Sequence, residues 1–131
     1  MANAPHIDVF RSPLGRARGR GSAKHGVGEW LATRIEAVAL VPLTIWFVFS
    51  VIHLAGATHE QVVAWMQSPW VMALMLALIG TTFHHLQLGL QNVIEDYIHD
   101  DAVKWAVSIA NKAICVLLAL ACIVSVLKIG L

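Results

Sequence analysis

Charged residues are scarce in this 131-residue sequence. Asp, Glu, Lys and Arg together make up 13% of it, whereas about 25% is usual in soluble domains. Hydrophobic residues account for 58%, above the roughly 45–50% of an ordinary globular chain. So short a chain has too few polar residues to cover such a core in water. The composition therefore excludes an ordinary soluble domain and predicts a protein that uses the bilayer as its solvent.

Cysteine is almost absent, which excludes a disulfide-stapled scaffold. The two cysteines, Cys115 and Cys122, both lie in the last apolar run of the chain and are seven residues apart. On a helix this spacing is about 10.5 Å, whereas a disulfide needs Cα atoms within about 7 Å of each other. We therefore expect both cysteines to be small packing residues.

We expect no secretory signal peptide before the first apolar run. Residues 1–24 are polar and rich in arginine, and the apolar run that follows is too long for the hydrophobic region of a signal. Residues 1–28 contain Gly, Arg, Ser and Pro without apolar periodicity, which predicts a flexible basic tail. The remaining residues, 29–131, then form one membrane-embedded domain.

Three long apolar runs follow the tail, at about residues 30–54, 70–94 and 103–128. Each exceeds the roughly 20 residues that a helix needs to cross a hydrocarbon core of about 30 Å. The connection at residues 55–69 is more polar, and a short acidic turn at residues 95–101 separates the last two runs. The sequence therefore predicts an all-α integral membrane protein with three transmembrane helices.

The distribution of Lys and Arg predicts the orientation of these helices. Most of the basic residues precede the first apolar run, whereas residues 55–69 contain no Lys or Arg. Because cytoplasmic segments are enriched in these residues, we expect the N-terminus to face the cytoplasm. With three crossings, the C-terminus then lies on the opposite side, and the turn at Asp96 and Tyr97 returns to the cytoplasmic face.

Polar residues in the second run form one stripe. His85, Gly89, Asn92 and Asp96 follow the i, i+4, i+7, i+11 spacing that places residues on one helix face. A histidine followed one turn later by glycine can ligate haem iron while the missing side chain lets a flat macrocycle approach. Alternatively, the histidine bonds to a neighbouring helix and the glycine permits close packing. His84 is a rival ligand, but it points about 100° away from His85, toward a face without the glycine.

Two segments of the sequence match a known family pattern. Residues 85–97 read H-x₃-G-x₆-D-Y, which resembles the signature of the small hydrophobic membrane anchor of bacterial succinate dehydrogenase, respiratory complex II. Residues 30–34, which end in an arginine, are similar to the start of the first span in that family. The resemblance covers about residues 28–131. It departs from the family in having Gly28 where a histidine can stand, and His25 is out of register, so it is assigned no haem role.

The resemblance implies a role for five residues. His85 would be an axial ligand of haem b, with its nitrogen on the haem iron, and Gly89 would pack against the haem. Arg34 would pair with a haem propionate. Tyr97 would contact ubiquinone, with Asp96 as its neighbour at the quinone site. The second iron ligand would come from a second membrane anchor subunit, a cytochrome b.

The function implied by the resemblance is that of a non-catalytic subunit in an enzyme complex, succinate:quinone oxidoreductase. The chain would dock an iron–sulfur subunit and a flavoprotein subunit, which carry the iron–sulfur clusters and FAD of the electron path from succinate to ubiquinone. It would lie in the bilayer of a bacterial inner membrane, with a cytoplasmic N-terminus and a periplasmic C-terminus. Nucleic acid is not expected among its partners.

Two other functions are compatible with the polar second run. A small transporter or channel component would line a path with polar side chains there: His84, His85, Gln87, Gln91 and Asn92. Three spans without an inverted repeat or a pair of broken helices disfavour this reading. A purely structural helix-packing subunit is the third reading. Of the remaining polar residues, we expect Glu36 to face a partner subunit, and Lys112 to snorkel or to pair with another chain.

Overall fold

Four helices make up almost all of the described chain. A computed structural model describes residues 26–131, so the predicted flexible tail lies, up to residue 25, outside the described residues. The elements are α2 (Gly26–His53), α3 (His59–Met66), α4 (Pro69–Tyr97) and α5 (Asp101–Gly130). α2, α4 and α5 are the three apolar runs of the sequence, and α3 is a short helix in the connection between the first two.

The three long helices are apolar and long enough to cross a membrane. Their candidate spans contain 27, 29 and 30 residues, which correspond to roughly 40–45 Å at 1.5 Å per residue. This length exceeds the hydrocarbon core of about 30 Å. The prediction of an all-α multi-pass membrane protein with three spans is therefore confirmed.

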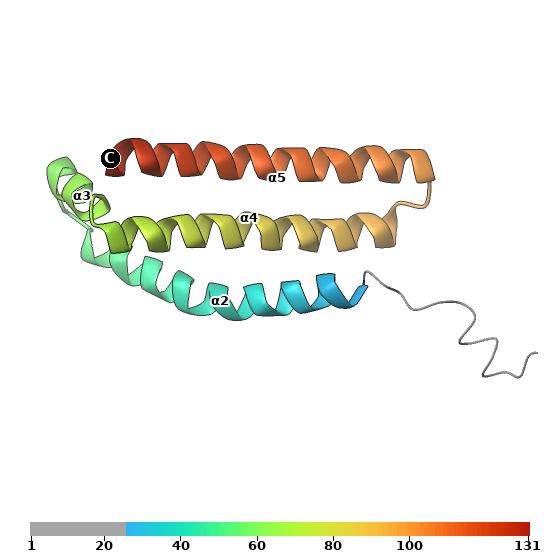
Figure 1. Cartoon of the computed structure of the whole chain (residues 1–131), viewed down its shortest axis with the longest axis horizontal. Coiled ribbons are helices and arrows are strands. Elements are labelled where there is room, and N and C mark those ends of the chain that lie inside the picture. The colour runs from blue at the N-terminus through green and yellow to red at the C-terminus, as the bar shows by residue number, and fades with distance from the viewer. Residues whose placement is uncertain (1–25) are drawn as a thin grey trace, which may run out of the picture.

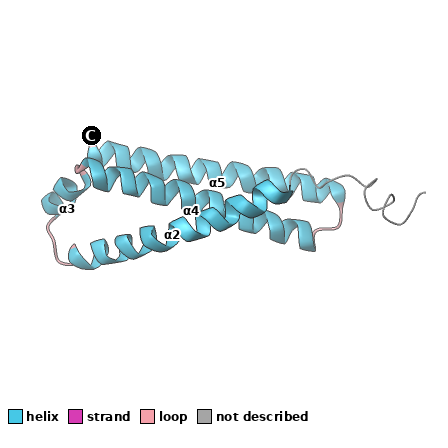
Figure 2. Cartoon of the chain, turned by 60° about the horizontal axis from the view of Figure 1, so that its bottom comes forward, coloured by secondary structure: helices cyan, strands magenta, loops and turns pink. Residues whose placement is uncertain are grey.

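The long helices lie side by side in one layer, with α4 in the middle (Figure 1). α4 packs against α2 on one side and against α5 on the other, and α2 does not pack against α5. In the turned view, α2 crosses over α4 (Figure 2). Because the layer does not close into a bundle, most apolar side chains of α2 and α5 remain exposed to lipid or to other subunits.

The helix ends follow local hydrogen bonding as well as hydropathy. Thr58 and Gln61 form a capping box at the start of α3, and the Asp100 carboxylate accepts a bond of 2.9 Å from the Val103 amide at the start of α5. α4 continues to Tyr97, so residues 95–97, which the sequence places in a turn, are helical. The connection between α4 and α5 is only residues 98–100, because Asp100 supplies the cap.

The buried residues of the described chain lie on α4 and α5. Ile94 of α4 and Asn111, Cys115 and Val126 of α5 are each at most 9% exposed. The three α5 residues lie on one helix face at i, i+4 and i+15. Cys115 and Cys122 are both free thiols, which confirms that they do not pair with each other.

Candidate functional site

A carboxylate of α2 faces two adjacent histidines of α4. His84 donates from Nδ1 to Glu36 Oε1, and His85 Nδ1 lies 3.7 Å from Glu36 Oε2. The Glu36 side chain is only 17% exposed. The expectation that this carboxylate faces a partner subunit is therefore wrong, because it points into the contact between α2 and α4.

Two atoms of this cluster are buried without a hydrogen-bond partner. They are Glu36 Oε2 and His85 Nδ1, which face each other at 3.7 Å, beyond the length of a normal hydrogen bond. The His85 side chain as a whole is nevertheless 35% exposed. One ring nitrogen is thus enclosed beside a carboxylate, while part of the imidazole remains accessible.

Gly89 lies one turn after His85 and is not used for packing within the described chain. A Cβ built at this position meets no atom within 4 Å. The glycine therefore does not serve a close contact between α4 and its two neighbours. An accessible imidazole beside a bare stretch of backbone supplies a nitrogen donor and open space for a planar group, so these two residues fit a haem.

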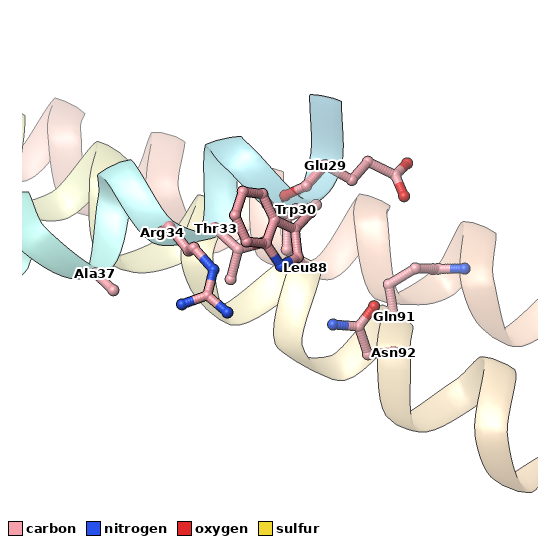
Figure 3. A pocket seen from close by; sticks show the side chains of 8 residues that line it. All are labelled: Glu29, Trp30, Thr33, Arg34, Ala37, Leu88, Gln91 and Asn92. Atoms are coloured by element: carbon pink, nitrogen blue, oxygen red, sulfur yellow. Dashed lines mark hydrogen bonds between the residues drawn. The ribbon is translucent and has the colours of Figure 1, made fainter. Parts of the chain in front are cut away.

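Arg34 lines a cavity of about 460 Å³ between α2 and α4 (Figure 3). Its guanidinium carbon lies 4.4 Å from the centre of the Trp30 ring, which is a cation–π distance. Asn92, a member of the predicted stripe, lines the same cavity. The structure thus places Arg34 near Asn92 of the predicted stripe. His85 and Gly89, the other members of the haem-binding prediction on α4, do not line this cavity. Its lining residues are Glu29, Trp30, Thr33, Arg34, Ala37, Leu88, Gln91 and Asn92.

Asp96 and Tyr97 form the last turn of α4, at the end of the layer where α2 and α5 begin (Figure 1). The Tyr97 side chain is 78% exposed. Tyr97 lies twelve positions after His85, or about 18 Å along the helix. The His85 end and the Tyr97 end of the predicted stripe therefore lie at separate positions along one helix.

Hydrogen bonds between α4 and α5 involve polar residues to which sequence reasoning assigned no packing role. Asn111 donates from its amide to the Gln87 backbone carbonyl at 3.0 Å, and Gln91 donates to the Ser108 hydroxyl at 3.1 Å. The available signal was the spacing of Asn111 and Cys115, which places a polar residue and a small residue on one face of an apolar helix. Glu36 had no such signal, because its partner His84 lies 48 residues away in the sequence.

No cluster of protein side chains in residues 26–131 is arranged to hold a metal ion by itself. No group of three or more His, Cys, Asp or Glu side chains in this part of the chain meets the geometry of such a site. A metal contributed by a prosthetic group is a different case, because it needs only one axial nitrogen from each side.

Comparisons with known proteins agree on one family. The model of the succinate dehydrogenase/fumarate reductase transmembrane subunit matches residues 9–125. The chain is 31% identical to the succinate dehydrogenase hydrophobic membrane anchor subunit of Rickettsia bellii, over 92% of this chain and 97% of that protein. It is 29% identical to the same subunit of Paracoccus denitrificans, over 75% of this chain and 76% of that protein. No solved structure matches the chain.

Proposed function

The chain belongs to the succinate dehydrogenase/fumarate reductase transmembrane subunit family, and from this premise we propose that it ligates haem b through His85 jointly with a second membrane anchor subunit. Membership makes the chain a membrane anchor that associates with catalytic subunits, and it favours the anchor over a transporter component. The haem, the quinone site and the identity of each neighbouring subunit are parts of the proposal.

The observation that carries the haem role is the open face of α4 at His85 and Gly89. The imidazole is partly exposed, and a Cβ at the glycine would meet nothing within 4 Å. The chain thus offers one imidazole and an uncovered helix face beside it. When bound there, haem b supplies a one-electron carrier inside the membrane. His85 would hold the iron, and a residue of the companion subunit would supply the second ligand.

Arg34 is the residue we assign to a haem propionate. Its guanidinium is permanently charged and can hold a carboxylate with two parallel hydrogen bonds. Its position in a cavity shared with Asn92 supports this assignment, because that cavity adjoins the stripe that contains His85. Stacking on Trp30 holds the guanidinium in place without consuming its hydrogen-bond donors.

Tyr97 and Asp96 are the residues we assign to the quinone site. A phenol can donate a hydrogen bond to a quinone carbonyl, which stabilises the negative charge that develops on the oxygen as electrons arrive. The exposure of Tyr97 at the end of α4 supports this role, because a site shared with other subunits needs an accessible side chain. Asp96 lies beside it and adds an acidic group at the same end.

The same end of the layer is the surface we propose for docking the soluble subunits. It would face the cytoplasm of a bacterium, with the anchor in the inner membrane, the N-terminus cytoplasmic and the C-terminus periplasmic. Electrons would pass from succinate through the flavoprotein and iron–sulfur subunits to ubiquinone near Tyr97. The excess of Lys and Arg before α2 supports this orientation.

The haem assignment is tested by replacing the proposed ligand in the purified complex. We expect His85→Ala to abolish the haem b signal in the reduced-minus-oxidised spectrum, because alanine has no nitrogen that could bind the iron. The matched control is His53→Ala, which removes an exposed histidine at the C-terminal end of α2. This variant should retain the signal. An undiminished signal in His85→Ala would refute the ligand assignment.

The quinone assignment has a separate test. Tyr97→Phe removes only the phenolic hydroxyl, so we expect it to depress quinone reduction by the complex several-fold, as expected for a lost hydrogen bond of about 1 kcal/mol. Oxidation of succinate by an artificial acceptor should remain unchanged. A quinone reductase rate equal to that of the unmodified complex would remove Tyr97 from the quinone site.

A further inference from the structure

Glu36 is a carboxylate placed well inside a membrane helix. It lies ten residues after the start of α2, or about 15 Å along the helix. Acidic side chains at such positions are costly and usually have a defined partner. Its neighbours are two imidazoles of α4, and the haem role proposed above uses only one of these three side chains. The cluster therefore contains an acidic side chain, Glu36, to which no role has been assigned.

The unsatisfied atoms of the cluster indicate what Glu36 can do. Glu36 Oε2 and His85 Nδ1 are both buried and lack partners, and they face each other across 3.7 Å. A carboxylate oxygen accepts hydrogen bonds, and a neutral imidazole carries one N–H and one free nitrogen. A small approach of the two side chains would satisfy both atoms with one charge-assisted bond.

Such a bond determines which nitrogen of His85 is left to bind iron. A histidine that ligates a metal almost always donates its other ring N–H to a carboxylate, a carbonyl or water, and this contact orients the ring and raises its basicity. We propose that Glu36 is the positioning residue for His85. Its carboxylate accepts a hydrogen bond from Nδ1–H, so that Nε2 is the nitrogen presented to the haem iron. This inference rests on the proposed haem role of His85.

His84 has a supporting part in the same arrangement. It donates to Glu36 Oε1, the oxygen that does not face His85, and its side chain is 57% exposed. The carboxylate is thereby held from the more exposed side, with its other oxygen directed at His85. This explains why two adjacent histidines of α4 both face one acid, although they point about 100° apart on the helix.

The proposal predicts a change in haem potential, which a purely structural role of Glu36 would not produce. A negative charge at Nδ1 strengthens electron donation from the imidazole and stabilises ferric over ferrous haem. Glu36→Gln keeps the size of the side chain but removes the charge. We expect it to favour the ferrous form about tenfold, which raises the midpoint potential by about 59 mV for a one-electron couple.

The experiment is a redox titration of haem b in the purified complex, with electron paramagnetic resonance of the ferric form as a second readout. Glu36→Asp retains a carboxylate, and its potential should lie closer to that of the unmodified complex than the potential of Glu36→Gln. Glu60→Gln removes the same charge from an exposed residue in the first turn of α3 and should leave the potential unchanged. Loss of haem from Glu36→Gln alone would also support the proposal, since outer partners typically contribute 10–100-fold to metal affinity.

Three outcomes separate this proposal from the one on which it rests. If Glu36→Gln retains haem with an unchanged potential and resonance spectrum, the positioning role is wrong even though His85 remains the ligand. An equal shift in Glu60→Gln would show a general charge effect and would also refute it. If His85→Ala keeps its haem signal, the ligand assignment itself fails, whatever Glu36→Gln does.

Discussion

The two interfaces of α4 differ in how their polar groups are satisfied. Toward α5, the buried amide of Asn111 donates to a backbone carbonyl of α4, and Cys115 donates to the Asn111 oxygen at 3.6 Å. Toward α2, the carboxylate of Glu36 meets two imidazoles, and two of the buried atoms have no partner. The α5 interface is thus bonded through neutral amide and hydroxyl groups, with Gln91 Oε1 left without a partner. The α2 interface instead contains a carboxylate and two imidazoles.

This difference separates holding the helices together from binding a cofactor. Lipid tails are as apolar as leucine, so membrane helices associate through close packing and hydrogen bonds between them. The contact between α4 and α5 meets this need within the chain. An acid inside a membrane helix is costly and usually has a defined role, and the haem proposal gives the cluster between α2 and α4 such a role.

The largest effect that can sharpen this comparison is expected at Gly89. If a planar group lies on that face, Gly89→Leu should reduce haem content by at least about tenfold, because a leucine would occupy the space of the macrocycle. The measurement is haem per complex, from the pyridine haemochrome spectrum and a protein assay.

The matched control for that variant is Gly80→Leu. Gly80 is another α4 glycine with no atom within 4 Å of a built Cβ, but it lies beside Cys115 and Ala119 on the α5 side. We expect this variant to retain haem. Full haem content in Gly89→Leu, or equal losses in both variants, would contradict the assignment of different functions to the two sides of α4.

A smaller effect is expected on the α5 side. Asn111→Ala removes the bond to the Gln87 carbonyl and should lower the free energy of unfolding by about 0.6–1.7 kcal/mol, the range measured for hydrogen bonds between membrane helices. Unfolding in mixed detergent micelles would measure it. Asn92→Ala, an exposed amide on the α2 side, should change stability by less than about 0.5 kcal/mol. Equal losses in the two variants would remove the special role of Asn111.

The smallest effect is expected where α5 ends against α3 and α4. A Cβ at Gly130 would lie 2.5 Å from the terminal methyl of Met72 and 3.4 Å from the Met66 carbonyl oxygen. Gly130→Ala should change stability by less than about 0.5 kcal/mol, because a flexible methionine can move and alanine gains helix propensity. The same detergent unfolding would measure it. Gly130→Val should cost about 1–3 kcal/mol through overpacking, and an equally mild effect of valine would show that this end is loosely packed.

The parts of the site that were predictable are those contained within one helix. The placement of His85 and Gly89 on neighbouring turns follows from helical periodicity, and the separation of Tyr97 from His85 follows from the rise per residue. The partner of His85 was not predictable in this way. The expectation for Glu36 was wrong because a residue on α2 can face lipid, another subunit or α4, and hydropathy does not distinguish these surroundings.

The sequence alone specifies three membrane-spanning helices, because in lipid every backbone polar group must be bonded within its own helix. It also specifies which residues share a face of α4, since that depends only on the helical repeat. The packing of the helices, in contrast, brings Glu36 to His84 and His85, and Asn111 to α4. These contacts depend on how the helices cross and on their relative rotation, which arise from packing between segments far apart in the sequence.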